Sequence, residues 1–524
     1  MDPVQSAPAR PIRVLFFMEH LRRYLRFFDP VIRELLDRGH IVHLVFEKEV
    51  DELGEDYDAW LREMHARPGF RSTVNDAWRQ DPWFRVARPL RGALDYAHSS
   101  WADVDRAPFL ISRARRRSPL WGRVLQSLAS LGGERGTRLL ERLLATLERG
   151  IPPSRRVREI VRTERPDVVV SAPHLMPGST DTHYVRAAML AGAPVCVCVP
   201  SWDNLSSKQL LHVVPDAITV WNDFQRREAV ELHGIPEERV VVTGAQSFDQ
   251  WFEWPPRGRE EFCARVGLDP SRPYVLYLAG ALFPSTLTEA EWLPRWIESL
   301  RSRGGPALQA ASILVRPHPL RMADWEAFAG DVPGGVTVWP RSNDAMPVGE
   351  AARADYFDSI HHSAAVVGIN TSAMLEAAIA GKAVHTVLVP EFWNSQDGVF
   401  HFRYLREAGG GLLRVARDLD EHVAQLEGAV SREDRSGEAA AERFVASFIR
   451  PHGRDVRATD RLVSAIEGLA ETGARAGTRE ARWVALLRPL LAAGMIPFLF
   501  RRVRWKLAFE ARRARRRIGQ PESG

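Results

Sequence analysis

Cysteine, lysine and long uncharged apolar runs are all scarce in this 524-residue chain. Cys196, Cys198 and Cys263 are its only thiols, and so small and odd a number excludes a disulfide scaffold and fits a reducing compartment. No apolar run reaches about 18 residues without a charge, so a clean membrane-spanning helix is not expected. Residues 1–10 lack the apolar core of a signal peptide. We therefore expect a cytoplasmic protein.

The charge of the chain is unevenly distributed. Only four of its 71 basic residues are lysines, which codon usage in a GC-rich genome explains without a functional cause. The formal net charge is +5, but residues 501–517 contain nine basic residues and one acid, a local charge of +8. The rest of the chain is therefore slightly acidic. Because no recognition module is visible either, we expect no nucleic-acid partner.

Apolar runs alternate with amphipathic helical patterns in the first 250 residues, which favours a parallel sheet with crossover helices. We expect strands at 12–17, 40–46, 167–171, 195–199, 217–221 and 240–243, and helices at 28–38, 181–191 and 223–233. Gly39 is typical of the residue that ends a helix. Residues 251–259, which contain two prolines, predict a linker.

Residues 50–150 interrupt this alternation and are rich in tryptophan and arginine. Their pattern predicts helices at 121–130 and 138–148. We interpret the segment as a helical insertion on the first domain. It is either an irregular elaboration of that domain or a surface that binds the acceptor or faces a membrane.

A second alternating series fills the next 200 residues. We expect strands at 274–278, 312–316, 336–339, 365–369 and 383–389, and helices at 288–303, 323–329, 355–361 and 372–380. Two such series of similar size predict two doubly wound α/β domains that face each other. The expected boundaries are 1–250 for the first domain, 251–450 for the second and 451–524 for a helical tail. Ligands of such sheets bind beyond the carboxyl ends of the strands.

The most specific motif is the turn at Asn370, Thr371 and Ser372, between a strand and a helix. A helix start offers backbone amide donors and a partial positive charge, which suit a phosphate. Glu376 lies one turn into the helix, where its carboxylate can accept hydrogen bonds from a ribose diol. The alternative is an ordinary capped turn followed by a solvated acid.

Two further strand ends carry polar groups that suit a phosphate. Arg316 ends a strand, and prolines on both sides of His318 fix the backbone there. His318 can donate to a phosphate oxygen or act as an acid, although a packed turn histidine is the alternative. Gly280 and Ser285 follow another strand, where glycine permits close approach and the hydroxyl can contact phosphate, although simple turn chemistry is the alternative.

Candidate bases lie at strand ends in the first half. His20 is the first choice because imidazole titrates near neutral pH, and His174 and Asp203 are its rivals. Cys196 and Cys198 alternate within one strand and share a face. We interpret them as buried small apolar residues rather than metal ligands.

Together these motifs resemble GT-B-type glycosyltransferases. The similarity is to the branch of CDP-glycerol glycerophosphotransferases and the related non-hydrolysing UDP-N-acetylglucosamine 2-epimerases, and it covers residues 10–45 and 165–425. It is carried by residues 316–319, 368–376 with 381–382, 221–222, 242–244 and 248–249. The resemblance implies a GT-B-like α/β fold of two facing Rossmann-like domains. It also implies that the second domain holds the nucleotide, with His318 and the start of the helix at 371–372 on the phosphates and Glu376 on the ribose.

The expected function is transfer of a sugar from a nucleotide-activated donor to a surface-polysaccharide or lipid-linked acceptor. The resemblance implies that neither a metal nor a cofactor takes part. The alternatives are a CDP-alcohol phosphotransferase, a sugar-nucleotide 2-epimerase and a scaffold without activity. Residues 483–517 join an interrupted apolar stretch to the basic segment, which is typical of a helix on an anionic membrane surface. A helix that packs back across the domains is the other interpretation.

Overall fold

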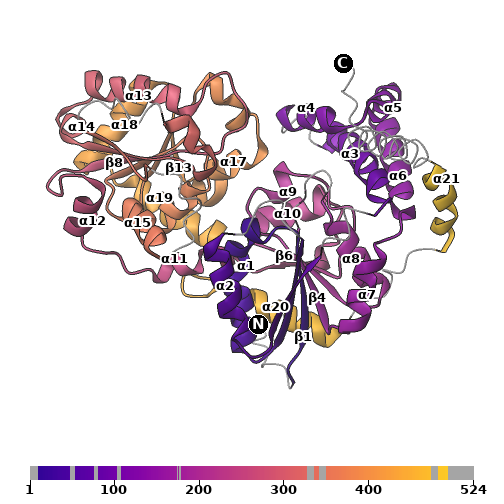
Figure 1. Ribbon diagram of the computed structural model, residues 1–524. Coiled ribbons are helices and arrows are strands. Elements are labelled where there is room, and N and C mark those ends of the chain that lie inside the picture. The colour runs from indigo at the N-terminus through magenta and orange to yellow at the C-terminus, as the bar shows by residue number, and fades with distance from the viewer. Residues whose placement is uncertain are drawn as a thin grey trace, which may run out of the picture.

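The computed structural model shows two α/β lobes side by side (Figure 1). It describes residues 10–47, 54–75, 81–102, 108–173, 175, 179–326, 335–341, 350–473 and 482–493. His174 and the basic segment 501–517 lie outside these residues. Among those described, no helix is both long and apolar enough to cross a membrane.

The first lobe is built on a seven-stranded parallel sheet of order β3-β2-β1-β4-β5-β6-β7. Its strands are β1 Arg13–Met18, β2 Ile41–Glu47, β3 Phe70–Asn75, β4 Val168–Ala172, β5 Val195–Cys198, β6 Ala217–Val220 and β7 Val240–Val242. In the centre, Val14 of β1 pairs with Val42 of β2 and Val168 of β4. Every residue of β4 and β5 is buried, because helices cover both faces of the sheet. Cys196 and Cys198 pack in one apolar cluster with their sulfur atoms 3.8 Å apart, as buried apolar residues would.

The helices that flank this sheet include α1 Leu21–Asp37, α2 Glu55–His65, α7 Arg155–Glu164, α8 Asp181–Leu190, α9 Asn204–Ser207 and α10 Asp223–Glu231. The first begins seven residues before its predicted start at Phe28. Pro30 therefore lies inside the helix rather than in its first turn. In the structure Leu21, Tyr24 and Leu25 extend the buried face of the helix through the turns before the proline.

Part of the segment predicted to be a helical insertion belongs to the sheet. β3 pairs in parallel with β2, and α2 connects the two strands. The helical part runs from α3 Phe84–Ala102 through α4 Pro108–Arg117 and α5 Leu120–Ser130 to α6 Gly133–Gly150. The helices predicted at 121–130 and 138–148 are thus present as α5 and most of α6.

The second lobe contains a six-stranded parallel sheet of order β10-β9-β8-β11-β12-β13. Its strands are β8 Tyr274–Leu278, β9 Ser312–Arg316, β10 Val336–Val338, β11 Ala365–Val367, β12 Val384–Val387 and β13 Leu413–Ala416. Its helices are α12 Arg259–Val266, α13 Glu289–Arg303, α14 Pro306–Ala310, α15 Glu350–His361, α16 Ala373–Ile379, α17 Phe400–Glu407, α18 Leu419–Ser431 and α19 Ser436–Phe444. The predicted helix at 323–329 overlaps the 3-10 helix η4 Pro319–Trp325, and its residues 327–329 lie outside the described residues. The strand orders of the two sheets confirm the predicted architecture of two facing Rossmann-like domains.

The chain crosses between the lobes twice. α11 Asp249–Glu253 leads into the second lobe, and α20 Ala458–Thr472 returns to pack on the first sheet. Asp249 joins the two crossings, because its carboxylate accepts from Arg450 at 2.7 Å and from the amide of Thr459 at 2.7 Å. After α20, η9 Arg482–Leu487 and α21 Arg488–Ala493 lie against α6.

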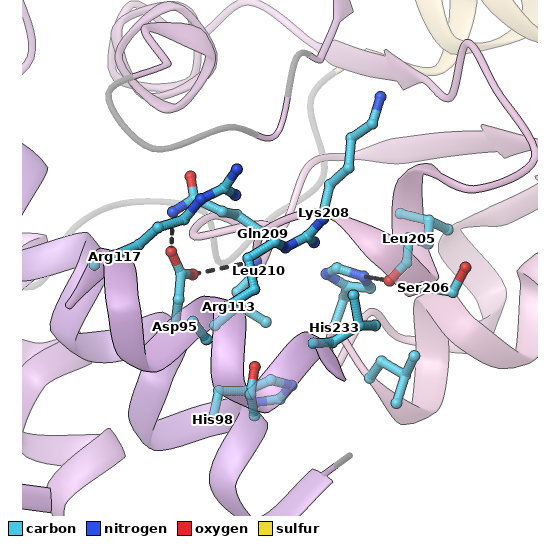
Figure 2. A pocket seen from close by; sticks show the side chains of 15 residues that line it. Asp95, His98, Arg113, Arg117, Leu205, Ser206, Lys208, Gln209, Leu210 and His233 are labelled. Carbon is cyan, nitrogen blue, oxygen red and sulfur yellow. Dashed lines mark hydrogen bonds between the residues drawn. The ribbon is translucent and has the colours of Figure 1, made fainter. Parts of the chain in front are cut away.

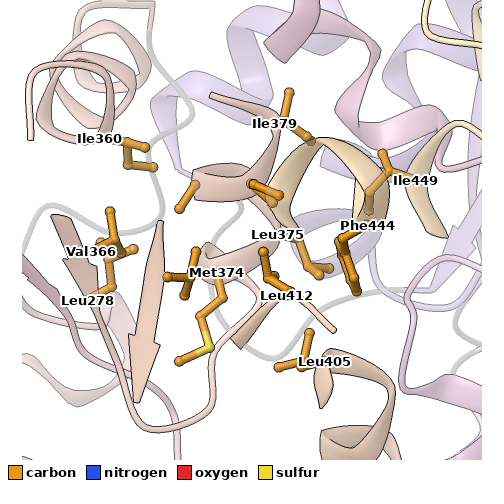
Figure 3. Close-up of a cluster of buried hydrophobic side chains, with 14 of the residues drawn as sticks. Leu278, Ile360, Val366, Met374, Leu375, Ile379, Leu405, Leu412, Phe444 and Ile449 are labelled. Carbon is orange, nitrogen blue, oxygen red and sulfur yellow. The ribbon is translucent and has the colours of Figure 1, made fainter. Parts of the chain in front are cut away.

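Both sheets reverse their strand order once, between β1 and β4 and between β8 and β11. These switch points are where doubly wound sheets bind ligands. A buried apolar cluster supports the switch point between β8 and β11. In this cluster Met374, Leu375 and Ile379 of α16 pack with Leu278 of β8 (Figure 3). The turn before α16 is therefore held by the core of the lobe.

Candidate functional site

The candidate site lies at the junction of the lobes, where the loop after β5 meets the turn before α16. The indole nitrogen of Trp202, just beyond β5, donates to the hydroxyl of Ser372 at 3.1 Å. The same indole packs edge-on against His401 of α17, with ring centroids 4.9 Å apart. On the other side, Tyr404 donates a hydrogen bond to Glu228 of α10. The turn predicted to bind phosphate thus faces the first lobe.

In the second lobe, the loops after β8 and β11 touch. A Cβ atom on Gly280 would lie 2.8 Å from the carbonyl oxygen of Asn370, so only glycine allows this approach. The amide of Gly280 donates to Glu289 Oε2 at 2.7 Å, and the hydroxyl of Tyr277 donates to Glu289 Oε1 at 2.8 Å. Burial raises the pKa of Glu289 to about 7. Glu289 therefore positions the Gly280 loop from inside the lobe.

The start of α16 makes its contacts with protein. The amides of Ala373, Met374 and Leu375 all bond back to Thr371 or Ser372. The side-chain nitrogen of Asn370 donates to the carbonyl of Ser395. With the Ser372 hydroxyl bonded to Trp202, this seven-residue helix exposes fewer donors than the sequence suggested. Side chains around the turn thus become the main candidates for ligand contacts.

Glu376 is half-buried at the junction, and the hydroxyl of Tyr356 donates a hydrogen bond to it. Burial raises the pKa of Glu376 to about 7, although the bond from Tyr356 and the positive charge of Arg26 oppose this rise. Arg26 belongs to α1 of the first lobe. The carboxyl therefore faces a cation of the other lobe, as a group at a shared site would.

His318 follows β9 and is also half-buried. Its Nδ1 accepts a hydrogen bond from the amide of Leu320 at 3.2 Å. Burial, with the charges of Arg26 and Arg321, lowers the pKa of His318 to about 4. The ring is thus neutral at physiological pH, and because Nδ1 is an acceptor, Nε2 carries the proton. His318 can therefore donate one hydrogen bond from Nε2.

Two residues predicted to contact the donor are bonded within the lobe. Arg316 is buried, donates to Ser359 Oγ at 2.8 Å and lies over the ring of Tyr356 at 5.1 Å. It therefore supports the partner of Glu376 from behind. Ser285 bonds to both the amide and the carbonyl of Leu287, which is ordinary turn geometry.

Arg26 connects these groups to a set of cations. It is exposed on α1, and its charge acts on Glu376 and His318 of the second lobe and on Lys208 of the first. Lys208, whose pKa is lowered by burial, also interacts with the charges of Arg23 and Arg113. Four basic side chains thus gather on the first-lobe side of the junction. No sequence pattern distinguishes Arg26, since it is one of several arginines on α1.

The predicted base His20 lies at the start of α1, beside Glu19. Its Nε2 is 3.4 Å from Glu19 Oε1, and Glu19 Oε2 accepts from the amide of Thr180 at 3.3 Å. Both residues follow β1, at the switch point of the first sheet. Burial raises the pKa of the nearby Tyr24, and the charges of Asp181, Glu19 and Asp203 add to this. The charges of all three carboxylates therefore act on Tyr24.

Asp203 is bonded on both oxygens, by Ser201 at 2.8 Å and by Ser207 at 3.0 Å. Burial alone would raise its pKa, but the charges of Lys208 and His401 and the two serine hydroxyls hold it at about 2. The carboxylate is thus always ionised near neutral pH. It is a weak base and a good partner for Lys208.

A pocket next to this region opens between the insertion and the loop after α9 (Figure 2). Lys208, Arg113 and Arg117 line it together with Asp95, whose carboxylate accepts from the amide of Leu210 at 3.2 Å. The insertion also reaches the second lobe, since Phe109 packs on Phe283 with ring centroids 4.8 Å apart. The helical insertion therefore forms one wall of the junction. Within the residues described, no three side chains form a cluster suited to a metal ion.

No family model and no curated protein matches the chain. Solved structures that it is similar to include a glycosyltransferase from Rickettsia africae ESF-5, which is 11% identical over 88% of this chain and 100% of that one, with a TM-score of 0.48. A UDP-GlcNAc 2-epimerase from Neisseria meningitidis, bound to UDP-GlcNAc, is 11% identical over 86% of this chain and 99% of that one, with a TM-score of 0.47. The 2-epimerase from Methanocaldococcus jannaschii is 11% identical over 87% and 99%, with a TM-score of 0.44. Glycosyltransferases and 2-epimerases are also what the sequence motifs resemble.

Proposed function

We propose that this chain is a glycosyltransferase that moves a sugar from a nucleotide-activated donor to a surface-polysaccharide or lipid-linked acceptor, without a metal ion. One observation carries the proposal. His318 and Glu376 lie on separate strand–helix connections of the second lobe, yet the charge of Arg26 from the first lobe acts on both. A neutral donor, a carboxylate and a cation thus meet at the switch point, where doubly wound sheets bind nucleotides.

The donor diphosphate would bind between the lobes. His318 would donate from Nε2 to a phosphate oxygen, while Arg26 and Lys208 would balance the charge that develops on the leaving nucleoside diphosphate. These cations supply the positive charge that a metal ion provides in other transferases. Glu376 would accept from the ribose hydroxyls in its ionised form, which makes the stronger hydrogen bonds.

The acceptor would bind on the first lobe, with His20 as the base. As the acceptor hydroxyl oxygen bonds to the anomeric carbon, His20 would take the hydroxyl proton, and the bond from that carbon to the diphosphate would break. Glu19 would orient the imidazole, as carboxylates do for catalytic histidines. Asp203, with its pKa of about 2, would hold Lys208 rather than act as the base.

The proposal is tested by thermal denaturation with UDP, CDP, GDP, ADP and dTDP. A nucleotide at 100 times its dissociation constant should raise the free energy of unfolding by about 2.7 kcal/mol. Glu376→Gln and Arg26→Gln should each reduce that stabilisation. Glu298→Gln and Arg295→Gln are the matched controls, because both residues are exposed on α13 away from the junction. If no nucleotide stabilises the chain, or if all four variants respond alike, the assignment fails.

Turnover then identifies the reaction. With the sugar form of the stabilising nucleotide and a mixed saccharide acceptor, a new glycosidic bond supports the proposal. A phosphodiester product from a CDP-alcohol, or isomerisation of the donor alone, would replace it with one of the alternatives. His20→Ala should lower kcat while the stabilisation by nucleotide is kept.

A further inference from the structure

The insertion turns apolar side chains toward solvent. On α5 and the turn after it, Leu120, Leu128 and Leu131 are 69%, 61% and 85% exposed. The other large apolar side chains exposed on α5 and α6 are Trp121, Val124, Leu125, Leu139 and Leu143. Both helices lie at the outer edge of the first lobe, away from the sheets (Figure 1). Such a face is unusual for a helix that meets only water.

The inner face of α5 is small and polar instead. A Cβ atom on Gly122 would lie 2.7 Å from the Cβ of Ala93 on α3, so this face packs closely against the lobe. Gln126 is buried and donates to Thr137 Oγ1 of α6 at 3.1 Å. The usual order, with apolar residues inside and polar residues outside, is thus reversed along α5. Because α5 packs tightly on α3 through this small polar face, a rotation of the helix does not account for its exposed apolar residues.

The exposed apolar residues continue onto the neighbouring chain segment. η9 and α21 pack against α6, where a Cβ atom on Gly150 would meet Leu491. They add Trp483, Leu486 and Leu490, which are 54%, 79% and 66% exposed. Together α5 with the turn after it, α6, η9 and α21 hold eleven of the seventeen exposed large apolar side chains found among the described residues. We call the eleven side chains the hairpin face.

The two main helices of this face also carry positive charge. Residues 120–150, which include α5 and α6, contain three glutamates and five arginines, a net charge of +2, and all five arginines are exposed: Arg123, Arg135, Arg138, Arg142 and Arg149. The 31 residues that follow Ala493 in the sequence include the segment 501–517 with its charge of +8. A surface that combines exposed leucine and tryptophan with arginine complements a bilayer of anionic lipid in both polarity and charge.

We propose that the hairpin face docks the protein on an anionic lipid bilayer. The apolar side chains enter the boundary between headgroups and acyl chains, and the arginines contact the lipid phosphates. This surface is separate from the junction of the lobes, so the proposal holds or fails independently of the nucleotide. It also places the insertion, one wall of the junction, next to the membrane, which suits a lipid-linked acceptor.

The test is cosedimentation of the full chain with vesicles. Wild-type protein should bind vesicles of phosphatidylcholine with 30% phosphatidylglycerol and bind pure phosphatidylcholine weakly, and 0.5 M salt should reduce binding by screening the charges. A triple variant Leu120→Gln, Leu128→Gln, Leu131→Gln should bind at least about tenfold more weakly. The control is Val74→Gln, Leu190→Gln, Val456→Gln, which changes three exposed apolar residues elsewhere and should bind as wild type does.

Each other occupant of the face gives a distinct result that overturns the proposal. Equal vesicle binding by both triple variants would assign membrane contact to residues 494–524 alone. If wild type does not bind vesicles but forms a dimer in sedimentation velocity, and the Leu120→Gln, Leu128→Gln, Leu131→Gln variant is a monomer, then the face is an interface between two copies of the chain. If wild type does not bind vesicles, and only the triple variant of the hairpin face has a lower Tm than wild type, then the face is covered by the chain itself.

Discussion

Glu289 gives the sharpest test of the electrostatics of the second lobe. The pKa of its carboxyl rises from about 4.5 in the unfolded chain to about 7 in the fold, because it is buried with only two hydrogen bonds. The folded protein thus keeps a proton that the unfolded chain has lost. Stability from this group is complete below pH 4.5 and decreases as the pH rises through 7.

The size of the effect follows from the pKa values. One pKa unit corresponds to about 1.4 kcal/mol, so ionised Glu289 costs the lobe about 3 kcal/mol above pH 7. Glu289→Gln keeps a side chain of the same shape, which can bond to Tyr277 and Gly280 as the protonated acid does. The free energy of unfolding of the variant, relative to that of wild type, should therefore rise by about 2 to 3 kcal/mol between pH 5 and pH 8.

Hydrogen exchange of the peptide that contains β8 measures this difference within the second lobe alone. Protection of the amides of residues 274–278 is converted to an opening free energy at each pH, after correction for intrinsic exchange. Glu298→Gln, on the exposed side of the same helix, should run parallel to wild type. A gain in Glu289→Gln that is the same at pH 5 and pH 8 would refute the burial argument.

Two further predictions concern the junction and the crossing between lobes. Donor binding should strengthen about three- to tenfold between pH 6 and pH 8 as Glu376 ionises, because the ionised carboxylate accepts stronger hydrogen bonds; isothermal titration should show the slope in wild type and not in Glu376→Gln. Asp249→Ala should lower the free energy of unfolding by about 3 to 5 kcal/mol, since it leaves the buried Arg450 unpaired. Exposed Asp223→Ala should change urea denaturation little, and similar losses in both variants would contradict this account.

Sequence predicts elements well where one physical signal dominates. β4 and β8 are continuous apolar runs buried on both faces, and they lie within a residue of their predicted bounds. β13 was missed because it is an edge strand with Arg414 inside it and only one buried residue. β3 was missed for a similar reason, as its Arg71 and Ser72 interrupt an apolar pattern. Edge strands depend on pairing with a neighbour that no local pattern records.

The residues of the candidate site also include some that local sequence patterns predict and some that they do not. His318, Asn370 and Glu376 were predicted because strand ends in a doubly wound sheet have a known use. Arg26 and Glu289 had no such signal: one is an ordinary helix arginine and the other an ordinary acid in a first turn. Their roles come from tertiary distance, which brings Arg26 to the second lobe and buries Glu289 under Gly280.

The two lobes bring different charges to the junction. The first lobe brings Arg23, Arg26, Arg113 and Lys208 together, and like charges this close repel one another, which helps to lower the pKa of Lys208. The second lobe faces them with a half-ionised carboxyl and a neutral imidazole, which offset little of that charge. A dianionic group placed between the lobes would relieve the repulsion and satisfy the Nε2 proton of His318. This arrangement would therefore suit the diphosphate of the proposed donor, and the contacts that join the lobes beside it include those of Trp202 with Ser372, Phe109 with Phe283 and Tyr404 with Glu228.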